Sequence, residues 1–271
     1  MTDDTKTAEA FADSWNNLPL GSVYTQKQFQ DWFTPITREN VEGKSVLELG
    51  CGNGSLLLHM AEWKPSRLVG VDLGSSVSSA RKNMERAGFD NYDLVQTDLT
   101  SFASDGFDMT YSIGVLHHLQ EPAKGFHSVI ANTKRGGRFH CWVYAREGNE
   151  IIIKVVDPLR KLVSRLPWWF TKYFVATPLV VPYYFYAKLV RLLRNSSVTK
   201  HAPIYEYSLW IAERDFGFFR HVAFDQLVTP QTVYLDQQTV ESWLADPRVK
   251  PESTYLVFRN GNSWKFGGVV A

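Results

Sequence analysis

The sequence predicts an α/β fold built on a doubly wound, mostly parallel sheet. Between residues 45 and 145, short apolar runs alternate with segments of helical spacing, which is how parallel strands with helical crossovers appear in a sequence. The first apolar run ends in three glycines at alternate positions, a pattern typical of a strand-to-helix turn that holds a nucleotide. After residue 235 the pattern indicates one more helix and two more strands.

The parallel part of the sheet is predicted from five apolar runs and the helices between them. The helix that precedes Gly88 ends there, because glycine favours a helix C-terminus, and the third helix starts at Pro122. Strands are expected at residues 45–49, 67–73, 92–98, 107–113 and 137–143, and helices at 55–61, 76–87 and 122–133.

The carboxyl-terminal residues 236–271 predict the final helix and two strands. Asp236 is a good helix N-cap, and an apolar face follows it through residue 245. Strands are expected at 253–258 and 264–270, around the turn at 260–262.

Residues 147–235 form a long segment between the fifth strand and the final helix, and their composition predicts a mainly helical insertion. A helix is expected to start at Asp157 and Pro158 and to end before Pro167, with Leu159, Leu162, Val163 and Leu166 on one side. The uncharged run 173–187 is too short, and with Pro178 and Pro182 too broken, to predict a membrane-spanning helix.

The predicted organisation therefore has four parts. Residues 1–40, with Trp15 and Tyr24, are expected to form a helical cap, and residues 41–146 a core that binds a cofactor. Residues 147–235 are expected to form an insertion that covers the site of the acceptor, the second substrate. Residues 236–271 complete the core sheet.

Composition narrows the class of protein. A formal charge of +1 over 271 residues argues against a surface that coats a polyanion. Cys51 and Cys141 lack the spacing of a zinc site or a disulfide framework, so no metal site is predicted and both are expected to be buried thiols. The polar amino terminus lacks a secretory signal pattern, which predicts a cytoplasmic protein.

The glycine turn indicates which ligand it holds. Glu48 is followed by Gly50, Gly52 and Gly54, and Ser55 stands where a dinucleotide fingerprint needs its last glycine. This segment resembles the cofactor loop of class I S-adenosylmethionine-dependent methyltransferases. The resemblance implies a seven-stranded, Rossmann-like sheet whose last strand is antiparallel. It also implies S-adenosyl-L-methionine as the cofactor, S-adenosyl-L-homocysteine as the product, and cofactor contacts from Glu48 and the loop residues Gly50, Cys51, Gly52, Asn53 and Gly54.

Two later strand ends supply further cofactor contacts by the same resemblance. Asp72, with Leu73 beside it, would hold the ribose hydroxyls, although nicotinamide enzymes use the same position. Asp98 would bind the adenine amino group and Leu99 the ring. The alternative for Asp98 is a turn cap.

The segment 107–118 ends in Val-Leu-His-His, as in many small-molecule methyltransferases. The resemblance implies that the backbone at Ser112 and Ile113 faces the methionyl ammonium. His117 and His118 would lie toward the acceptor, with His118 the preferred general base, because histidine titrates near neutrality. A packing role for both is the alternative.

Methyl transfer is an in-line displacement, so the protein positions the two reactants and excludes water. Trp15 and Tyr24 are candidates for closing the cofactor site, and ordinary core packing is the alternative. The aromatic insertion predicts a small, at least partly apolar acceptor. The candidate acceptor contacts are Tyr144, Arg146, Trp168, Trp169, Tyr173 and Tyr205.

Two other functions are consistent with parts of the sequence. A nicotinamide-dependent oxidoreductase shares the turn and Asp72. A non-catalytic module that binds a membrane surface is the third reading, because residues 151–195 hold eight Lys or Arg against one Asp, a net charge of +7, among aromatics. A solvated basic face over a packed core is its alternative. A nucleic-acid acceptor is disfavoured, since Ser112 to Val115 replaces the Pro-Pro-Tyr motif of base-flipping enzymes.

Overall fold

The computed structural model describes residues 3–16, 21–150, 152–163, 166–197, 199–229 and 231–271. Ile151, Ser164, Arg165 and Val198, which fall within the predicted insertion, lie outside the described residues. The chain divides into a sheet unit, residues 1–144, 231–257 and 264–271, and a helical unit, residues 145–230 and 258–263.

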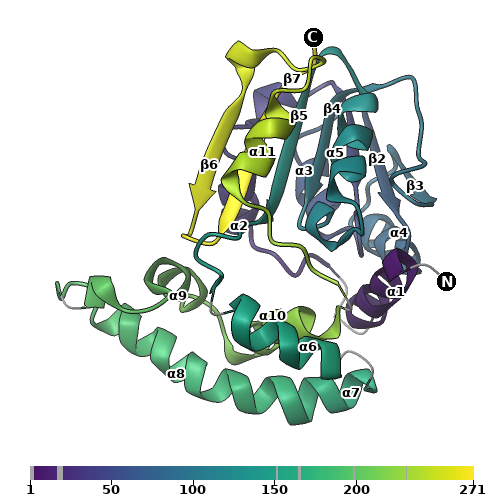
Figure 1. Ribbon diagram of the computed structural model, residues 1–271. Helices are drawn as coiled ribbons and strands as arrows, with labels where there is room; N and C mark the ends of the chain where they lie inside the picture. The colour runs from purple at the N-terminus through teal and green to yellow at the C-terminus, as the bar shows by residue number, and fades with distance from the viewer. Residues whose placement is uncertain (1–2, 17–20, 151, 164–165, 198, 230) are drawn as a thin grey trace. The chain divides into compact units, whose positions relative to one another are not determined.

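The sheet unit contains a seven-stranded sheet in the order β3-β2-β1-β4-β5-β7-β6, with β7 antiparallel (Figure 1). This confirms the predicted fold class. The pairs β1–β2, β1–β4, β2–β3 and β4–β5 are parallel, so their carboxyl ends meet at one edge. The strands are β1 (Ser45–Leu49), β2 (Arg67–Asp72), β3 (Tyr92–Gln96), β4 (Phe107–Ile113), β5 (Thr133–Tyr144), β6 (Tyr255–Arg259) and β7 (Ser263–Val269).

Helices cover both faces of this sheet because neighbouring side chains of a strand point to opposite sides. Phe139 of β5 contacts Phe126 of α5, whereas the next residue, His140, packs against Phe33 of α2. Figure 1 shows α5 and α11 together on one face. The helices of this unit are α1 (Asp3–Asn16), α2 (Gln26–Phe33), α3 (Ser55–Ala61), α4 (Val77–Arg86), α5 (Pro122–Ala131) and α11 (Gln237–Leu244).

Most differences from the predicted bounds lie at the ends of elements. The predicted strand 92–98 ends at Gln96, and the predicted strand 137–143 begins earlier, at Thr133. Asp236 caps α11 as predicted, its side chain accepting the Thr239 N–H at 2.9 Å. Residues 231–235 fall in the sheet unit rather than in the insertion, because Leu235 N–H donates to the Tyr144 carbonyl at 3.0 Å.

The helical unit contains α6 (Asp157–Val163), α7 (Trp168–Phe170), α8 (Thr177–Leu192), α9 (Tyr205–Ile211) and α10 (Phe216–Val228). A π-helical segment, Thr171–Ala176, joins α7 directly to α8. Pro182 lies inside α8 and Pro178 in its first turn, where a missing N–H costs little, so the prolines do not interrupt this helix. No helix among the described residues is long and apolar enough to cross a membrane.

The core of the helical unit lies between α8, α9 and α10. Val180 and Ala187 of α8 pack with Ile211, Ala212 and Phe219. The apolar side predicted for the first helix of the insertion is wrong: Val163 is buried, but Leu162 is 73% exposed, and Leu166 lies beyond α6 and is exposed. Arg160 is buried there instead, and its guanidinium pairs with Asp157 at 2.7 Å.

Candidate functional site

The glycine loop between β1 and α3 has the backbone conformation that its sequence requires. Gly50, Gly52 and Gly54 have φ angles of +88°, +53° and +77°, a region that side chains disfavour. A Cβ on Gly50 would lie 2.3 Å from Cγ2 of Val115, and one on Gly54 would lie 3.1 Å from Cβ of Ala80. Two of the three glycines therefore allow the loop to pack closely against Val115, which follows β4, and against α4.

Gly52 faces a different neighbour. A Cβ at this position would lie 3.7 Å from Nε1 of Trp15, which is ordinary van der Waals contact. The indole of α1 therefore lies beside the glycine loop. Helix α1 is held at the carboxyl ends of the strands by Asp4, which accepts the Gln120 N–H at 2.8 Å, and by Glu9, which accepts from Ser75.

Asp72 ties the loop to the end of β2. One carboxylate oxygen accepts the Gly52 N–H and the other the Gly74 N–H, both at 2.8 Å. Burial raises the pKa of Asp72, while the hydrogen bonds from Gly74, Gly52 and Ser76 act in the opposite direction. A carboxylate has about four acceptor sites, so the three hydrogen bonds from Gly52, Gly74 and Ser76 leave capacity to accept one further hydroxyl group.

Glu48 lies deeper than the loop. It is 1% exposed, and the hydroxyl of Tyr111 donates to its Oε2 at 3.0 Å. Burial raises the pKa of Glu48 to about 8; the Tyr111 hydrogen bond lowers it, and the charge of Asp72 raises it. Glu48 is therefore protonated in the native protein at neutral pH.

This protonation predicts a pH-dependent stability. Unfolded Glu48 titrates at its ordinary pKa of 4.5, so between pH 4.5 and 8 the native state holds the extra proton and stability falls as pH rises. His140 acts oppositely below pH 6.5, since burial lowers its pKa to about 3. Between pH 6.5 and 8 we expect the deprotonation of Glu48 to lower the free energy of unfolding by about 2 kcal/mol.

Urea denaturation at pH 6.5 and pH 8 measures the effect. The Glu48→Gln variant should lose this component of the pH dependence while keeping an acceptor for Tyr111. The matched control is Glu42→Gln, because Glu42 is an exposed carboxylate that pairs with Arg38 at 3.1 Å. Equal pH dependence in wild type and Glu48→Gln would contradict a protonated Glu48.

Several predicted cofactor residues have internal roles. The Asn53 side chain accepts from the N–H and hydroxyl of Ser55, and the Ser112 hydroxyl donates to the Leu49 carbonyl at 2.8 Å. The Cys51 thiol is buried against β2, close to Gly70. Contact of the Ser112 and Ile113 backbone with the methionyl ammonium stays a prediction.

Asp98 forms the turn that the sequence offered as the alternative to adenine binding. Its Oδ1 accepts both the N–H and the hydroxyl of Thr100 at 2.8 Å. Leu99 is buried, and its carbonyl accepts from the Ser128 hydroxyl on α5. The turn ends β3 early and uses one carboxylate oxygen, so adenine binding by Asp98 stays a prediction that rests on Oδ2.

Aromatic side chains form a continuous series at the carboxyl edge of the sheet. Trp15 lies 6.2 Å from Tyr24, Tyr24 4.7 Å from Trp32, and Trp32 6.1 Å from Trp142, measured between ring centroids. The series continues from Trp142 to Tyr144 and His117. We name these six residues the aromatic wall.

Trp142, like Trp32, is a member of the aromatic wall that sequence analysis missed as a functional candidate. Its indole N–H is buried and has no hydrogen-bond partner among the described residues. The available signal was alternation within β5: Cys141 and Val143 are buried, whereas Trp142 and Tyr144 are partly exposed on the other side.

His117 and His118 are both buried and differ in tautomer. The Tyr144 N–H donates to His117 Nδ1 at 3.4 Å, so this nitrogen is the acceptor in the neutral ring. His118 Nδ1 lies 3.1 Å from the Gln231 carbonyl, which can only accept, so Nδ1 carries the proton. In neutral His118, therefore, Nε2 is the basic nitrogen.

The candidate acceptor contacts divide between the two units. Tyr144 lies in the sheet unit, 4.1 Å from the His117 ring. Arg146, Trp169, Tyr173 and Tyr205 lie in the helical unit, where Arg146, Trp169 and Tyr173 are exposed and the Tyr205 hydroxyl donates to the Arg194 carbonyl at 3.3 Å. Trp168 begins α7, and its side chain lies outside the described structure.

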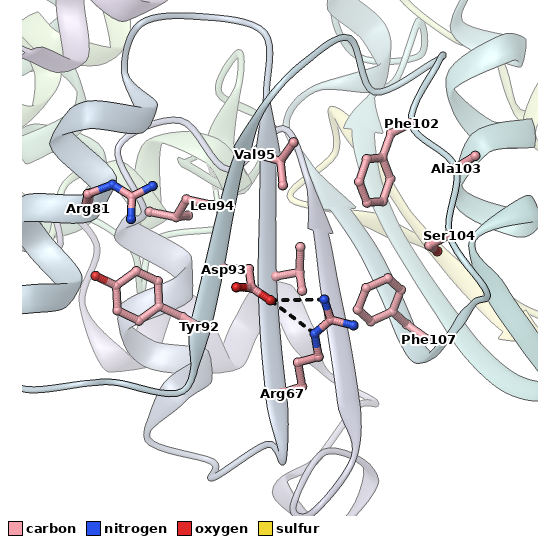
Figure 2. A pocket seen from close by; sticks show the side chains of 11 residues that line it. Arg67, Arg81, Tyr92, Asp93, Leu94, Val95, Phe102, Ala103, Ser104 and Phe107 are labelled. Atoms are coloured by element: carbon pink, nitrogen blue, oxygen red, sulfur yellow. Dashed lines mark hydrogen bonds and ion pairs between the residues drawn. The ribbon is translucent and has the colours of Figure 1, made fainter.

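A pocket of about 490 Å³ lies elsewhere on the sheet unit, near the starts of β2, β3 and β4. Figure 2 shows Arg67 and Asp93 joined across its floor, with Phe107 beside them. None of the predicted site residues lines it. Because parallel sheets bind ligands at the carboxyl ends of their strands, this pocket is not the candidate site.

The comparison with protein families matches the part of the chain that contains β1 to β5. A family model described as a methyltransferase domain matches residues 40–157. A tRNA U34 carboxymethyltransferase of a Sulfurovum species is 29% identical over 100 residues, which are 36% of this chain and 33% of that protein. A probable (S)-tetrahydroprotoberberine N-methyltransferase 2 of Papaver bracteatum is 33% identical over 82 residues, 29% of this chain and 23% of that protein. The chain thus spans under half the length of these curated relatives.

A solved structure agrees over the whole length. The magnesium protoporphyrin IX methyltransferase of Synechocystis, determined with bound SAH, covers 100% of both chains with a TM-score of 0.59 and 14% sequence identity. At this identity the likeness concerns the fold.

Proposed function

We propose that the protein, whose residues 40–157 match a methyltransferase-domain model, is a class I S-adenosylmethionine-dependent methyltransferase that transfers a methyl group from S-adenosyl-L-methionine to a small, partly apolar acceptor. The observation that carries this proposal is the anchored loop. Three positive-φ glycines and the carboxylate of Asp72, which keeps one acceptor site after its three hydrogen bonds, fit a nucleoside that donates a ribose hydroxyl.

The glycine loop, Asp72 and the aromatic wall fit the proposed cofactor. The loop backbone at Gly52 faces the Trp15 indole, and Asp72 keeps an acceptor site for a ribose hydroxyl. When bound, S-adenosyl-L-methionine supplies an electrophilic methyl group on a sulfonium. The aromatic wall would exclude water and present ring faces that stabilise a cation.

The acceptor site of this proposal lies along Trp142, Tyr144 and His118. The buried N–H of Trp142 would donate to a polar atom of the acceptor, while the neighbouring rings contact its apolar part. His118 would take the acceptor's proton at Nε2, since Nδ1 is engaged by Gln231. His117, whose Nδ1 accepts the Tyr144 N–H, would orient the His118 ring.

Replacement of His118 tests its role. We expect His118→Gln to lower turnover by about a hundredfold, the usual contribution of a general base, without changing affinity for S-adenosyl-L-homocysteine. His127→Gln is the matched control, since His127 is an exposed histidine near Asp246.

A parallel loss of cofactor affinity and thermal stability in His118→Gln would show a structural role for His118 and remove it from the reaction.

Calorimetric titration with S-adenosyl-L-homocysteine tests the proposed function at its base. We expect saturable binding at one site, and no binding of NADH, which separates this function from the oxidoreductase alternative. A screen of metabolite extracts and of tRNA for transfer of labelled methyl then identifies the acceptor. Labelled tRNA, with no labelled small molecule, would contradict the acceptor class.

The buried thiols Cys51 and Cys141 support a cytoplasmic location as part of the proposal.

A further inference from the structure

The helical unit exposes an unusual amount of apolar surface along one helix. Residues 168–192, comprising α7, the π-helical segment and α8, run without interruption and form the long helix at the lower edge of Figure 1. Exposed apolar and aromatic side chains follow it from end to end. We name these residues the apolar stripe: Trp169, Phe170, Tyr173, Phe174, Leu179, Val181, Phe185, Leu189 and Leu192.

The apolar stripe lies opposite the packed face of α8. Val180 and Ala187 point into the core of the helical unit, whereas Phe185 is 66% and Leu192 78% exposed. Val181, Phe185, Leu189 and Leu192 recur at intervals of three and four residues, the spacing of a single helix face. The helix is thus apolar on both sides, and only one side is covered within the described unit.

The exposure of these side chains decides between the two interpretations of the basic, aromatic segment 151–195, which are a surface that binds a membrane and a solvated basic face over a packed core. A solvated basic face over a packed core requires aromatic side chains to be inside. Instead Phe174 is 63% exposed, and Trp169, Tyr173 and Phe185 are exposed as well. Exposed apolar patches of this extent mark interaction sites.

Charge identifies the occupant of the stripe. Among the described residues 152–197 the basic side chains are Lys154, Arg160, Lys161, Lys172, Lys188, Arg191 and Arg194, and the acidic one is Asp157. Asp157 neutralises Arg160. A second copy of this segment would bring like charges together, whereas an anionic lipid surface complements them. Tryptophan, tyrosine and phenylalanine are also the side chains that favour the membrane interface.

We propose that the apolar stripe docks the protein on the surface of an anionic membrane, with residues 168–192 lying in the plane of the headgroups. The stripe enters the boundary between headgroups and acyl chains. Lys188 and Arg191 donate to backbone carbonyls of the helical unit. The basic residues that contact anionic lipids are therefore the exposed Lys154, Lys161 and Arg194. This inference is independent of the methyl-transfer proposal. If both hold, acceptors that reside in the membrane are brought to the enzyme.

Vesicle co-sedimentation with the full chain tests the docking. We expect binding to phosphatidylcholine vesicles that contain phosphatidylglycerol, and much weaker binding to phosphatidylcholine alone. A variant with Phe174→Gln, Phe185→Gln and Leu189→Gln should bind at least about tenfold more weakly, because these side chains no longer enter an apolar phase. Val257→Gln is the matched control, an exposed apolar residue of β6. Lys161→Glu should reduce binding about fivefold, and only to anionic vesicles.

Two further readouts complete the test. Circular dichroism and S-adenosyl-L-homocysteine affinity should be unchanged in the triple variant, since its three substitutions are at exposed positions. Absence of vesicle binding by the wild type, or equal binding by the triple variant, would overturn the inference. So would a wild-type dimer that the triple variant dissociates, because a second copy would then be the occupant. Wild-type vesicle binding without cofactor binding would refute only the methyl-transfer proposal.

Discussion

Asp72→Ala is expected to weaken S-adenosyl-L-homocysteine binding by about 3 kcal/mol, more than a hundredfold in Kd, because hydrogen bonds to a charged acceptor contribute about 1.5 to 3 kcal/mol each. The variant loses the proposed contact with a ribose hydroxyl. It also releases the N–H groups of Gly52 and Gly74, which Asp72 holds at 2.8 Å, so the loop that contacts the cofactor is less ordered. Calorimetric titration measures the change in affinity.

The control for this prediction is Asp93→Ala. Asp93 is an exposed carboxylate on the neighbouring strand β3, where it pairs with Arg67 at 3.0 Å in the pocket of Figure 2. We expect no change in cofactor affinity, because that pocket is remote from the glycine loop. If Asp93→Ala weakened binding and Asp72→Ala did not, the cofactor would occupy the pocket of Figure 2 and our site assignment would fail.

Gly50→Ala is expected to destabilise the protein by about 3 to 4 kcal/mol, the sum of a left-handed backbone on a non-glycine residue and an overpacked contact. The φ angle of Gly50 is +88°, and the new Cβ would lie 2.3 Å and 2.6 Å from the two Cγ atoms of Val115. The loop must therefore move away from β4, and cofactor affinity should fall with stability. Urea denaturation monitored by circular dichroism measures the first effect.

Two companion variants separate the two causes. Gly88→Ala has a similar φ of +75° and no atom within 4 Å of the new Cβ, so it should cost only the backbone strain, about 1 kcal/mol. Val115→Ala in the Gly50→Ala background should recover part of the stability, because it removes both clashing Cγ atoms. Equal losses in Gly50→Ala and Gly88→Ala would show that the contact with Val115 is not what requires a glycine.

Local sequence signals were sufficient for most elements of the sheet unit. The glycine loop, the strand that precedes it and the Asp236 cap each depend on neighbours within a few residues, so spacing alone predicts them. The end of β3 was misplaced because Asp98 forms a turn with Thr100, a side-chain interaction that β propensity does not capture. The sequence does not predict that the helix continues through Pro182, and packing of α8 against α9 and α10 stabilises it there.

The sequence by itself determined the α/β class, the glycine loop and the importance of Asp72, because these follow from backbone conformation and from the order of strands along the chain. Only the tertiary structure decided which contacts each side chain makes and which side chains stay exposed. It revealed Trp142 as a buried donor, assigned different tautomers to His117 and His118, and left the apolar stripe exposed. Those properties depend on contacts between residues far apart in sequence, which no local pattern encodes.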